Sequence, residues 1–225
     1  NTSSMTGQSL VISMKDLNSD IQNVADIQFL RNFGKPTVAV MFQPKLTWAG
    51  SLKLEKNPTC IIIMTLGLSV TDSKPAVEPI VISKLENLPW TWNSIIPTEK
   101  GAVIIGVNEI AYMDNTGVLQ SVISINSFSE KDTIQSRVID NYKMELILHK
   151  DSLVNYWCST KNSGSTSNKE SKNNDSNDLL ILMTEQSDLY YVQMDFEGKL
   201  LTKFDLVELP IANNIFIDNL GPLCI

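Results

Sequence analysis

The sequence has few of the residues that most often carry chemistry or covalent cross-links. Its 225 residues include one histidine and three cysteines, and no two cysteines have the CxxC spacing of zinc and redox motifs. The odd cysteine count, with Cys60, Cys158 and Cys224, argues against a disulfide framework and indicates reduced cysteines in an intracellular protein. No apolar run reaches the roughly 18 residues that cross a bilayer, so no membrane partner is predicted.

Basic residues are also in the minority. The chain has 18 lysines and arginines against 25 aspartates and glutamates, which gives a net charge of −7. A protein whose main role is to cover nucleic-acid phosphates needs clustered basic residues. The charge balance therefore argues against that class, although it leaves room for a small basic patch.

Motifs for catalysis, cofactors and metals are missing. No P-loop, GxGxxG, HExxH or EF-hand pattern occurs, and no two carboxylates have a spacing that would hold them together for acid–base chemistry. The single histidine, His149, ends the stretch YKMELILH on its polar face, which is typical of a solvated side chain. The sequence therefore predicts no enzyme, and no catalytic, cofactor-binding or metal-binding residue.

Strand patterns dominate what is present. In DLYYVQMDF, the residues Tyr190, Val192 and Met194 fall on one face, and the alternation resumes after Glu197-Gly198, which predicts a hairpin. A second hairpin is predicted around Asp114–Gly117. Further strands are predicted at Gln8–Ser13, Asp26–Leu30, Thr37–Phe42, Leu46–Leu54, Thr59–Val70, Ala76–Ser83, Ala102–Val107, Tyr142–Leu148, Leu153–Cys158 and Leu179–Thr184.

Helical patterns are nearly absent. The best candidate is SDIQNVADIQFL (19–30), where Ile21, Val24 and Ile27 recur every three residues, but its end is equally compatible with a strand. Many short strands predict an all-β sandwich, barrel or propeller. Units of about 40–50 residues with four strands favour β-propeller blades. The Gly-His and Trp-Asp marks of WD repeats are missing, so the prediction is a divergent, WD40-like propeller.

One segment has the composition of a disordered loop. Residues 159–178, STKNSGSTSNKESKNNDSND, contain no apolar side chain. Such a segment cannot bury enough surface to offset its ordering entropy. Strand patterns resume on both sides, so we interpret it as a polar, disordered insertion within one domain.

Tryptophans provide the candidate contact residues. In LPWTWNSIIPT (88–98), Trp90 and Trp92 would share a face if the segment were a strand. They either pack within or between blades, anchor a partner protein, or stack on RNA, although no basic cluster nearby supports RNA. In KPTVAVMFQPKLTWAG (35–50), a strand, a Pro-centred turn and a second strand are predicted, with Trp48 filling a gap between sheets.

Three stretches resemble one known family. They are ADIQFLRNFGKPTVAVMFQPKLTWAG (25–50), LPWTWNSIIPTEKGAVIIGVNEIAYMDNTGVLQSVISINSF (88–128) and DLYYVQMDFEGKLLTKFDLVELP (188–210). They look like the largest subunit of the cleavage and polyadenylation specificity factor, in its budding-yeast form. QPKLTWAG and GAVIIGVNEIAYMDNTG are the most specific parts, and the resemblance covers most of the chain.

The resemblance implies a multi-propeller protein in which residues 1–225 form part of the first, N-terminal β-propeller. It further implies a nuclear scaffold for pre-mRNA 3′-end cleavage and polyadenylation, which organises a WD-repeat subunit, a zinc-finger subunit and poly(A) polymerase. Pre-mRNA would be contacted mainly through those partners. Two alternatives stay open: direct RNA binding by this segment, and a sister propeller scaffold of DNA repair or splicing, since those systems contain similar propellers.

Overall fold

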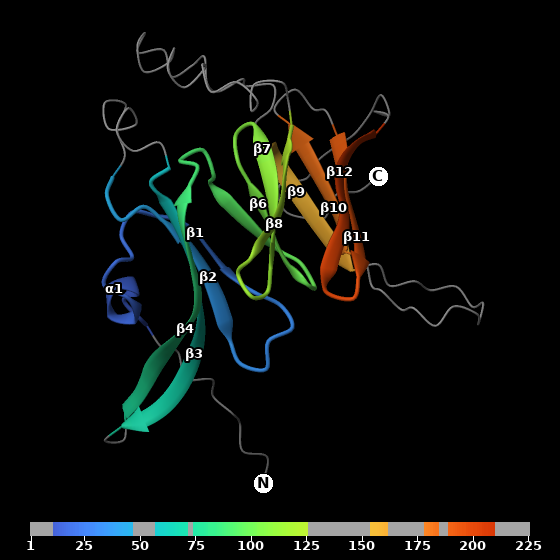
Figure 1. Cartoon of the computed structure of the whole chain (residues 1–225). Coiled ribbons are helices and arrows are strands. Elements are labelled where there is room, and N and C mark those ends of the chain that lie inside the picture. Colours follow the sequence, from blue (N-terminus) through green and yellow to red (C-terminus); the bar gives the residue numbers. More distant parts are fainter. Residues whose placement is uncertain are drawn as a thin grey trace, which may run out of the picture.

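The computed structural model describes residues 11–46, 57–71, 74–125, 154–161, 178–184 and 189–209. Within these ranges the chain forms one four-residue helix and twelve strands, arranged as three four-stranded antiparallel sheets (Figure 1). The chain is all-β, and its sheets are the blades of a partial β-propeller, as predicted.

Each sheet is built from consecutive strands, paired in chain order. Blade 1 contains β1 (Val24–Phe29), β2 (Thr37–Phe42), β3 (Thr59–Thr71) and β4 (Lys74–Leu88). Blade 2 contains β5 (Ser94–Pro97), β6 (Gly101–Ile105), β7 (Glu109–Asp114) and β8 (Leu119–Ser124). Blade 3 contains β9 (Val154–Lys161), β10 (Asp178–Thr184), β11 (Leu189–Glu197) and β12 (Leu200–Leu209).

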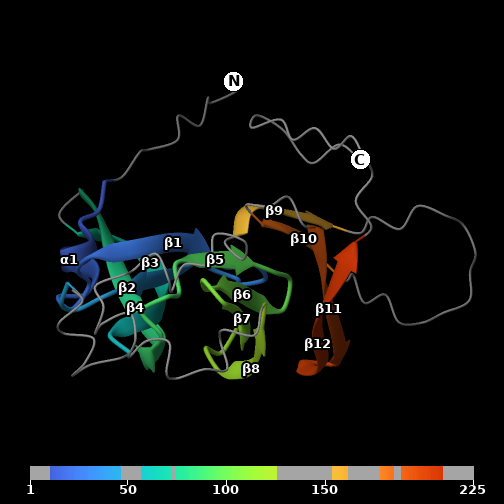
Figure 2. The same ribbon diagram turned by 90° about the horizontal axis from the view of Figure 1, so that it is seen from above.

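The three sheets stand side by side. Figure 2 shows β1, β5 and β9 along one side of the array and β4, β8 and β12 along the opposite side. The inner strands β2 of blade 1 and β6 of blade 2 are covered on both faces, and all of their residues are buried. This explains why TVAVMF and GAVII are continuous apolar runs, because a strand covered on both faces has no polar side.

The core lies between the blades. Blades 1 and 2 are joined by a cluster that includes Met41, Ile61 and Ile63 from one sheet and Ile95 and Ile104 from the other. A second cluster joins blades 2 and 3. Its members are Ile96, Val103, Ile105, Ile110, Tyr112, Leu180, Leu182, Val192, Met194 and Phe204. Packing between neighbouring sheets is the arrangement expected for propeller blades.

The far face of blade 1 is covered by α1 (Met14–Leu17) and the residues after it. Leu17 and Ile21 are buried there against Val38, Val40 and Phe42. The strand predicted at Gln8–Ser13 is wrong for residues 11–13, which form no strand and lead into the helix. Val11 is 97% exposed, so one of the residues that suggested a strand has no sheet to bury it.

The helical alternative for residues 19–30 is also wrong. Its spacing combines two elements: Ile21 packs beside α1, whereas Val24 and Ile27 belong to β1. Asn23, between them, has a φ of 43°, a left-handed conformation that separates the two elements.

The other strand predictions are confirmed where the structure describes the chain. Both predicted hairpins form, with Gly117 and Gly198 at positive φ in their turns. The predicted polar insertion, residues 159–178, includes residues that belong to strands of blade 3. Residues 159–161 are the end of β9, and Asp178 begins β10, where it pairs with Lys161. The predicted strands Leu46–Leu54 and Tyr142–Leu148 lie outside the described residues, apart from Leu46, which is not in a strand.

Candidate interaction site

Trp90 and Trp92 lie in a turn and not on a strand, so the condition under which they would share a face is not met. The turn is closed by the Trp92 N–H, which donates to the carbonyl of Pro89 at 3.2 Å. Trp92 is only 3% exposed and its indole N–H donates to Glu109 Oε1 at 2.7 Å. A Cβ added at Gly106 would lie 2.7 Å from Trp92 Cδ1, so the indole lies directly against that glycine.

The packing alternative therefore describes Trp92, which belongs to the core between blades 1 and 2. Trp90 is half-buried and keeps part of its side chain at the surface. A partner contact by Trp90 and Trp92 stays a prediction. Trp48 and His149 lie outside the described residues.

Polar side chains fix the position of blade 2 against blade 1. Asp26 Oδ2, on β1, accepts the backbone N–H of Ile95, on β5, at 2.7 Å. Its other oxygen accepts from the Ile27 N–H at 2.8 Å and from Gln28 Nε2 at 3.1 Å. At the next loop Asn32 Nδ2 donates to the carbonyl and to the carboxylate of Glu99. Asp26 therefore ties together the first strands of two blades.

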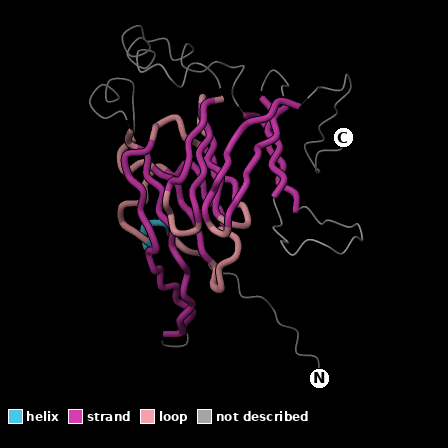
Figure 3. The backbone as a smooth tube through the Cα atoms, turned by 45° about the vertical axis from the view of Figure 1, so that its right-hand side comes forward, coloured by secondary structure: helices cyan, strands magenta, loops and turns pink. Residues whose placement is uncertain are grey.

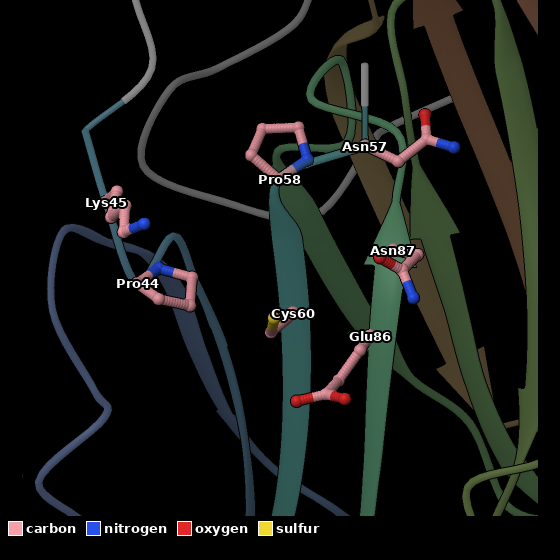
Figure 4. A pocket seen from close by; sticks show the side chains of 7 residues that line it. All are labelled: Pro44, Lys45, Asn57, Pro58, Cys60, Glu86 and Asn87. Carbon is pink, nitrogen blue, oxygen red and sulfur yellow. The ribbon is translucent and has the colours of Figure 1, made fainter. Parts of the chain in front are cut away.

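A hollow of about 290 Å³ lies at one end of blade 1. Figure 4 shows Cys60 on β3 between Pro44 and Glu86 on β4, with Asn57 and Asn87 at the edge. The residues come from β3 and β4 and from the loops that follow β2 and precede β3. The hollow could hold a small polar group, but no motif in the sequence marks it.

The electrostatics of this hollow do not activate the cysteine. Burial is the main cause, and the nearby Glu86 carboxylate the second, of a raised pKa of the Cys60 thiol, which favours the protonated and unreactive form.

Lys84 forms ion pairs with Glu86 at 2.7 Å and with Asp20 at 3.2 Å. Hydrogen bonds to these two carboxylates raise the pKa of Lys84, so it stays charged at neutral pH. Lys84 thereby links the α1 region to the outer strand of blade 1.

A larger hollow, about 490 Å³, lies where loops of all three blades meet. Its walls include Phe33 from blade 1, Lys100 and Asn115 from blade 2, and Lys199 from blade 3. The Lys100 ammonium lies 4.7 Å from the ring centroid of Phe196, and it therefore contacts blade 3 as well. Sequence patterns could not reveal this hollow, because its residues come from turns that are far apart in the chain.

The described part of the chain contains no group of three or more His, Cys, Asp or Glu residues that could hold a metal ion. No helix among the described residues is long and apolar enough to span a bilayer. What the described surface offers is therefore a set of loops, two hollows and exposed strand edges.

Comparisons with known proteins place the chain. No protein-family model matches it. The chain is 40% identical to Protein CFT1 of Saccharomyces cerevisiae over 98% of its own length and 16% of that protein. It is 36% identical to Protein CFT1 of Kluyveromyces lactis over 98% of its length and 15% of that protein.

A more distant match comes from an animal. The Cleavage and polyadenylation specificity factor subunit 1 of Drosophila melanogaster is 30% identical over 56% of the chain and 8% of that protein. The chain thus spans about a sixth of the length of its yeast relatives. Similarity to the yeast proteins over nearly every residue shows that the chain belongs to the family of Protein CFT1 and cleavage and polyadenylation specificity factor subunit 1.

Proposed function

We propose that this chain is part of a scaffold subunit of the nuclear machinery that cleaves and polyadenylates pre-mRNA 3′ ends. The observation that carries the proposal is the 40% identity to a Protein CFT1 over 98% of the chain. The relative from Drosophila melanogaster, Cleavage and polyadenylation specificity factor subunit 1, indicates the process. The protein would work by holding other subunits in place and would perform no catalysis itself.

The arrangement of the described residues supports a scaffold role. Their apolar side chains are used to join blades into one rigid unit, and their carboxylates close turns and tie blades together. Rigid sheets with loops at both ends provide broad surfaces for protein partners. In this proposal the partners are a WD-repeat subunit, a zinc-finger subunit and poly(A) polymerase, and pre-mRNA is contacted mainly through them.

The test is depletion and purification of the full-length protein that contains this chain. Depletion from cells should lengthen unprocessed 3′ ends and shorten or abolish poly(A) tails, and the tagged protein should co-purify with WD-repeat and zinc-finger subunits. Normal 3′ ends after depletion would overturn the proposal. Co-purification with DNA-repair or splicing subunits would favour a sister scaffold.

The purified protein also tests direct RNA binding. A scaffold that reaches RNA through its partners should bind an AU-rich oligonucleotide weakly without them, even at low salt, where phosphate contacts are strongest. Tight, salt-sensitive binding by the isolated full-length protein would instead favour the RNA-binding alternative.

A further inference from the structure

Blade 1 carries a two-stranded ribbon that continues beyond its own sheet. The ribbon consists of residues 66–71 of β3 and residues 74–79 of β4. Pairing between β2 and β3 ends at Thr37 and Thr65, whereas pairing between β3 and β4 continues to Thr71 and Lys74. Figures 1 and 3 show the ribbon projecting from the sheet. A two-stranded hairpin alone is only marginally stable in water, so a ribbon of this length is suited to gain a third strand.

The backbone groups on one edge of the ribbon are directed toward the side of β2. The N–H of Leu66 donates to the carbonyl of Pro36 at 2.8 Å, which is on that side. Backbone groups of successive residues in a strand alternate between its two edges, so Leu68 and Val70 present their N–H and C=O groups to the same side. Among the described residues, no strand is paired with 67–71 on this edge.

The opposite edge of the ribbon is blocked. Leu66 lies opposite Pro79, and Val70 lies opposite Pro75. Since Leu66 and Val70 point their backbone groups away from β4, these are pairs in which both partners face outward. Pro75 and Pro79 therefore occupy positions whose N–H groups would face outward from β4, and proline has none. Proline on an edge strand is a common protection against unwanted pairing.

The two edges are thus unequal: residues 66–71 of β3 contain no proline, whereas the β4 edge has lost donors at two positions. The geometry points to the β3 edge as a site where an extended segment of another subunit of the 3′-end processing factor adds as a strand. This inference rests on the proposed function for the identity of the partner. The fly relative is named as subunit 1 of its factor, which implies that such a factor has further subunits.

The edge also defines what the segment must be like. It needs an extended conformation and an N–H at each residue that faces Leu68 or Val70, so proline is excluded there. Lys35 is exposed and adjoins Pro36, where the pairing would begin. An acidic residue at that end of the incoming segment would complement this charge. Backbone pairing supplies the binding energy, and side chains of the partner supply the specificity.

The experiment uses the full-length protein in its native complex, with a photo-crosslinking amino acid at Val70 and, in a matched control, at Val77 on the β4 edge, which leaves Pro75 and Pro79 in place. We expect the probe at Val70 to cross-link to one contiguous peptide of another processing subunit, identified by mass spectrometry, and the probe at Val77 to give far less of it. Cross-links only within the same polypeptide, to a second copy of it, or to no partner at all would overturn the inference.

Proline substitutions provide a second measurement. Leu68→Pro and Val70→Pro remove donors from the free edge, and Val77→Pro removes the remaining outward donor between the two prolines of β4. We expect the first two to weaken retention of the cross-linked subunit about tenfold, and Val77→Pro to leave it unchanged. Equal retention by all three would overturn the inference. Because cross-linking keeps the natural backbone at Leu68 and leaves the ribbon intact, it stays decisive if a proline variant misfolds.

The two proposals fail in different ways. If the unmodified full-length protein co-purifies with no 3′-end processing subunit, the proposed function is wrong. If it co-purifies with them but Val70 contacts none, only the strand addition is wrong.

Discussion

The two interfaces between blades use different chemistry. Between blades 1 and 2 the buried side chains are mainly aliphatic, and the charged Asp26 accepts a backbone N–H across the boundary. Between blades 2 and 3 the contact centres on Tyr112, whose ring lies 5.5 Å from that of Phe196 and 6.1 Å from that of Phe204. Here the hydrogen bond across the boundary is neutral, because Gln120 Oε1 accepts the Leu201 N–H at 2.9 Å, and the charged Lys100 contacts the ring of Phe196.

Because of this difference, the two interfaces should respond differently to truncation of a buried side chain. Both interfaces contain many aliphatic side chains, but the first has one buried ring, that of Trp92, whereas the second brings the rings of Tyr112, Phe196 and Phe204 together. A fully buried aromatic side chain contributes more area than any aliphatic neighbour. Truncation of Tyr112 should therefore loosen blade 3 from blade 2 more than truncation of one aliphatic side chain loosens blade 2 from blade 1.

Removing the central ring should have the largest effect. Tyr112→Ala leaves a large cavity beside Phe196 and Phe204 and should cost about 3–5 kcal/mol. Hydrogen–deuterium exchange on the full-length protein should show faster exchange in β10–β12 and little change in β2. The matched variant Ile104→Ala, on the other face of blade 2, should accelerate exchange in β2 and β3 instead. Faster exchange in all three blades for both variants would contradict the comparison.

Two turn glycines test how tightly the first interface is packed. Gly117 has a φ of 83°, and a Cβ there would come within 2.5 Å of Ser83 Cβ on blade 1. Gly117→Ala adds overpacking to backbone strain and should cost roughly 2–4 kcal/mol. Gly198, at a φ of 63°, has nothing within 4 Å of such a Cβ.

Gly198→Ala should therefore cost only the backbone strain, roughly 1–2 kcal/mol. Chemical denaturation of both variants measures the difference. Equal losses of unfolding free energy would mean that the close approach of Gly117 to blade 1 does not add to the cost of the substitution.

The polar links across the two boundaries should rank by charge. Asp26→Ala leaves the partly buried N–H of Ile95 without its carboxylate acceptor and should cost about 1.5–3 kcal/mol. Gln120→Ala removes a neutral acceptor from the Leu201 N–H and should cost about 0.5–1.5 kcal/mol. Asp26→Asn retains a carbonyl oxygen and should fall between them. Denaturation midpoints provide the measurement, and a larger loss for Gln120→Ala would reverse the ranking.

Alternation in the sequence was sufficient to predict most of this architecture. Strand β11 alternates cleanly because one face of blade 3 meets blade 2 and the other carries Gln193 and Asp195, which are half-buried. The short helix α1 was missed because four residues are too few to show a 3.6-residue period. The false helical pattern at 19–30 arose because Ile21 is buried beside α1, whereas Ile27 belongs to β1 and is exposed, and local spacing cannot distinguish the two.

The candidate sites were much harder to predict. The sequence shows Trp90 and Trp92 as an aromatic pair, but in the turn after Pro89 only Trp92 is buried. The larger hollow depends on how turns of three blades meet, and the ribbon depends on the pairing register of β3 with β4. Register and inter-blade packing are tertiary properties, so one sequence shows neither directly.

The smallest effect should be a pH dependence centred on the turn that holds Gly117. Burial alone would raise the pKa of Asp114, but hydrogen bonds from Thr116, Val118 and Gln120 outweigh it and lower the pKa below the ordinary value of 3.8. Because the folded pKa lies below the unfolded one, the stabilisation is complete above the unfolded value and is lost as pH falls through the folded value.

Gln120 donates to Asp114 Oδ2 at 2.8 Å while accepting from Leu201, so protonating Asp114 should also weaken the link to blade 3. Between about pH 5 and pH 3, the free energy of unfolding should therefore fall more steeply with decreasing pH for the natural protein than for Asp114→Asn, which cannot titrate at this position. Chemical denaturation at each pH provides the measurement. Exchange of the Leu201 amide should rise over the same interval. Parallel curves would show that Asp114 does not couple protonation to the second interface.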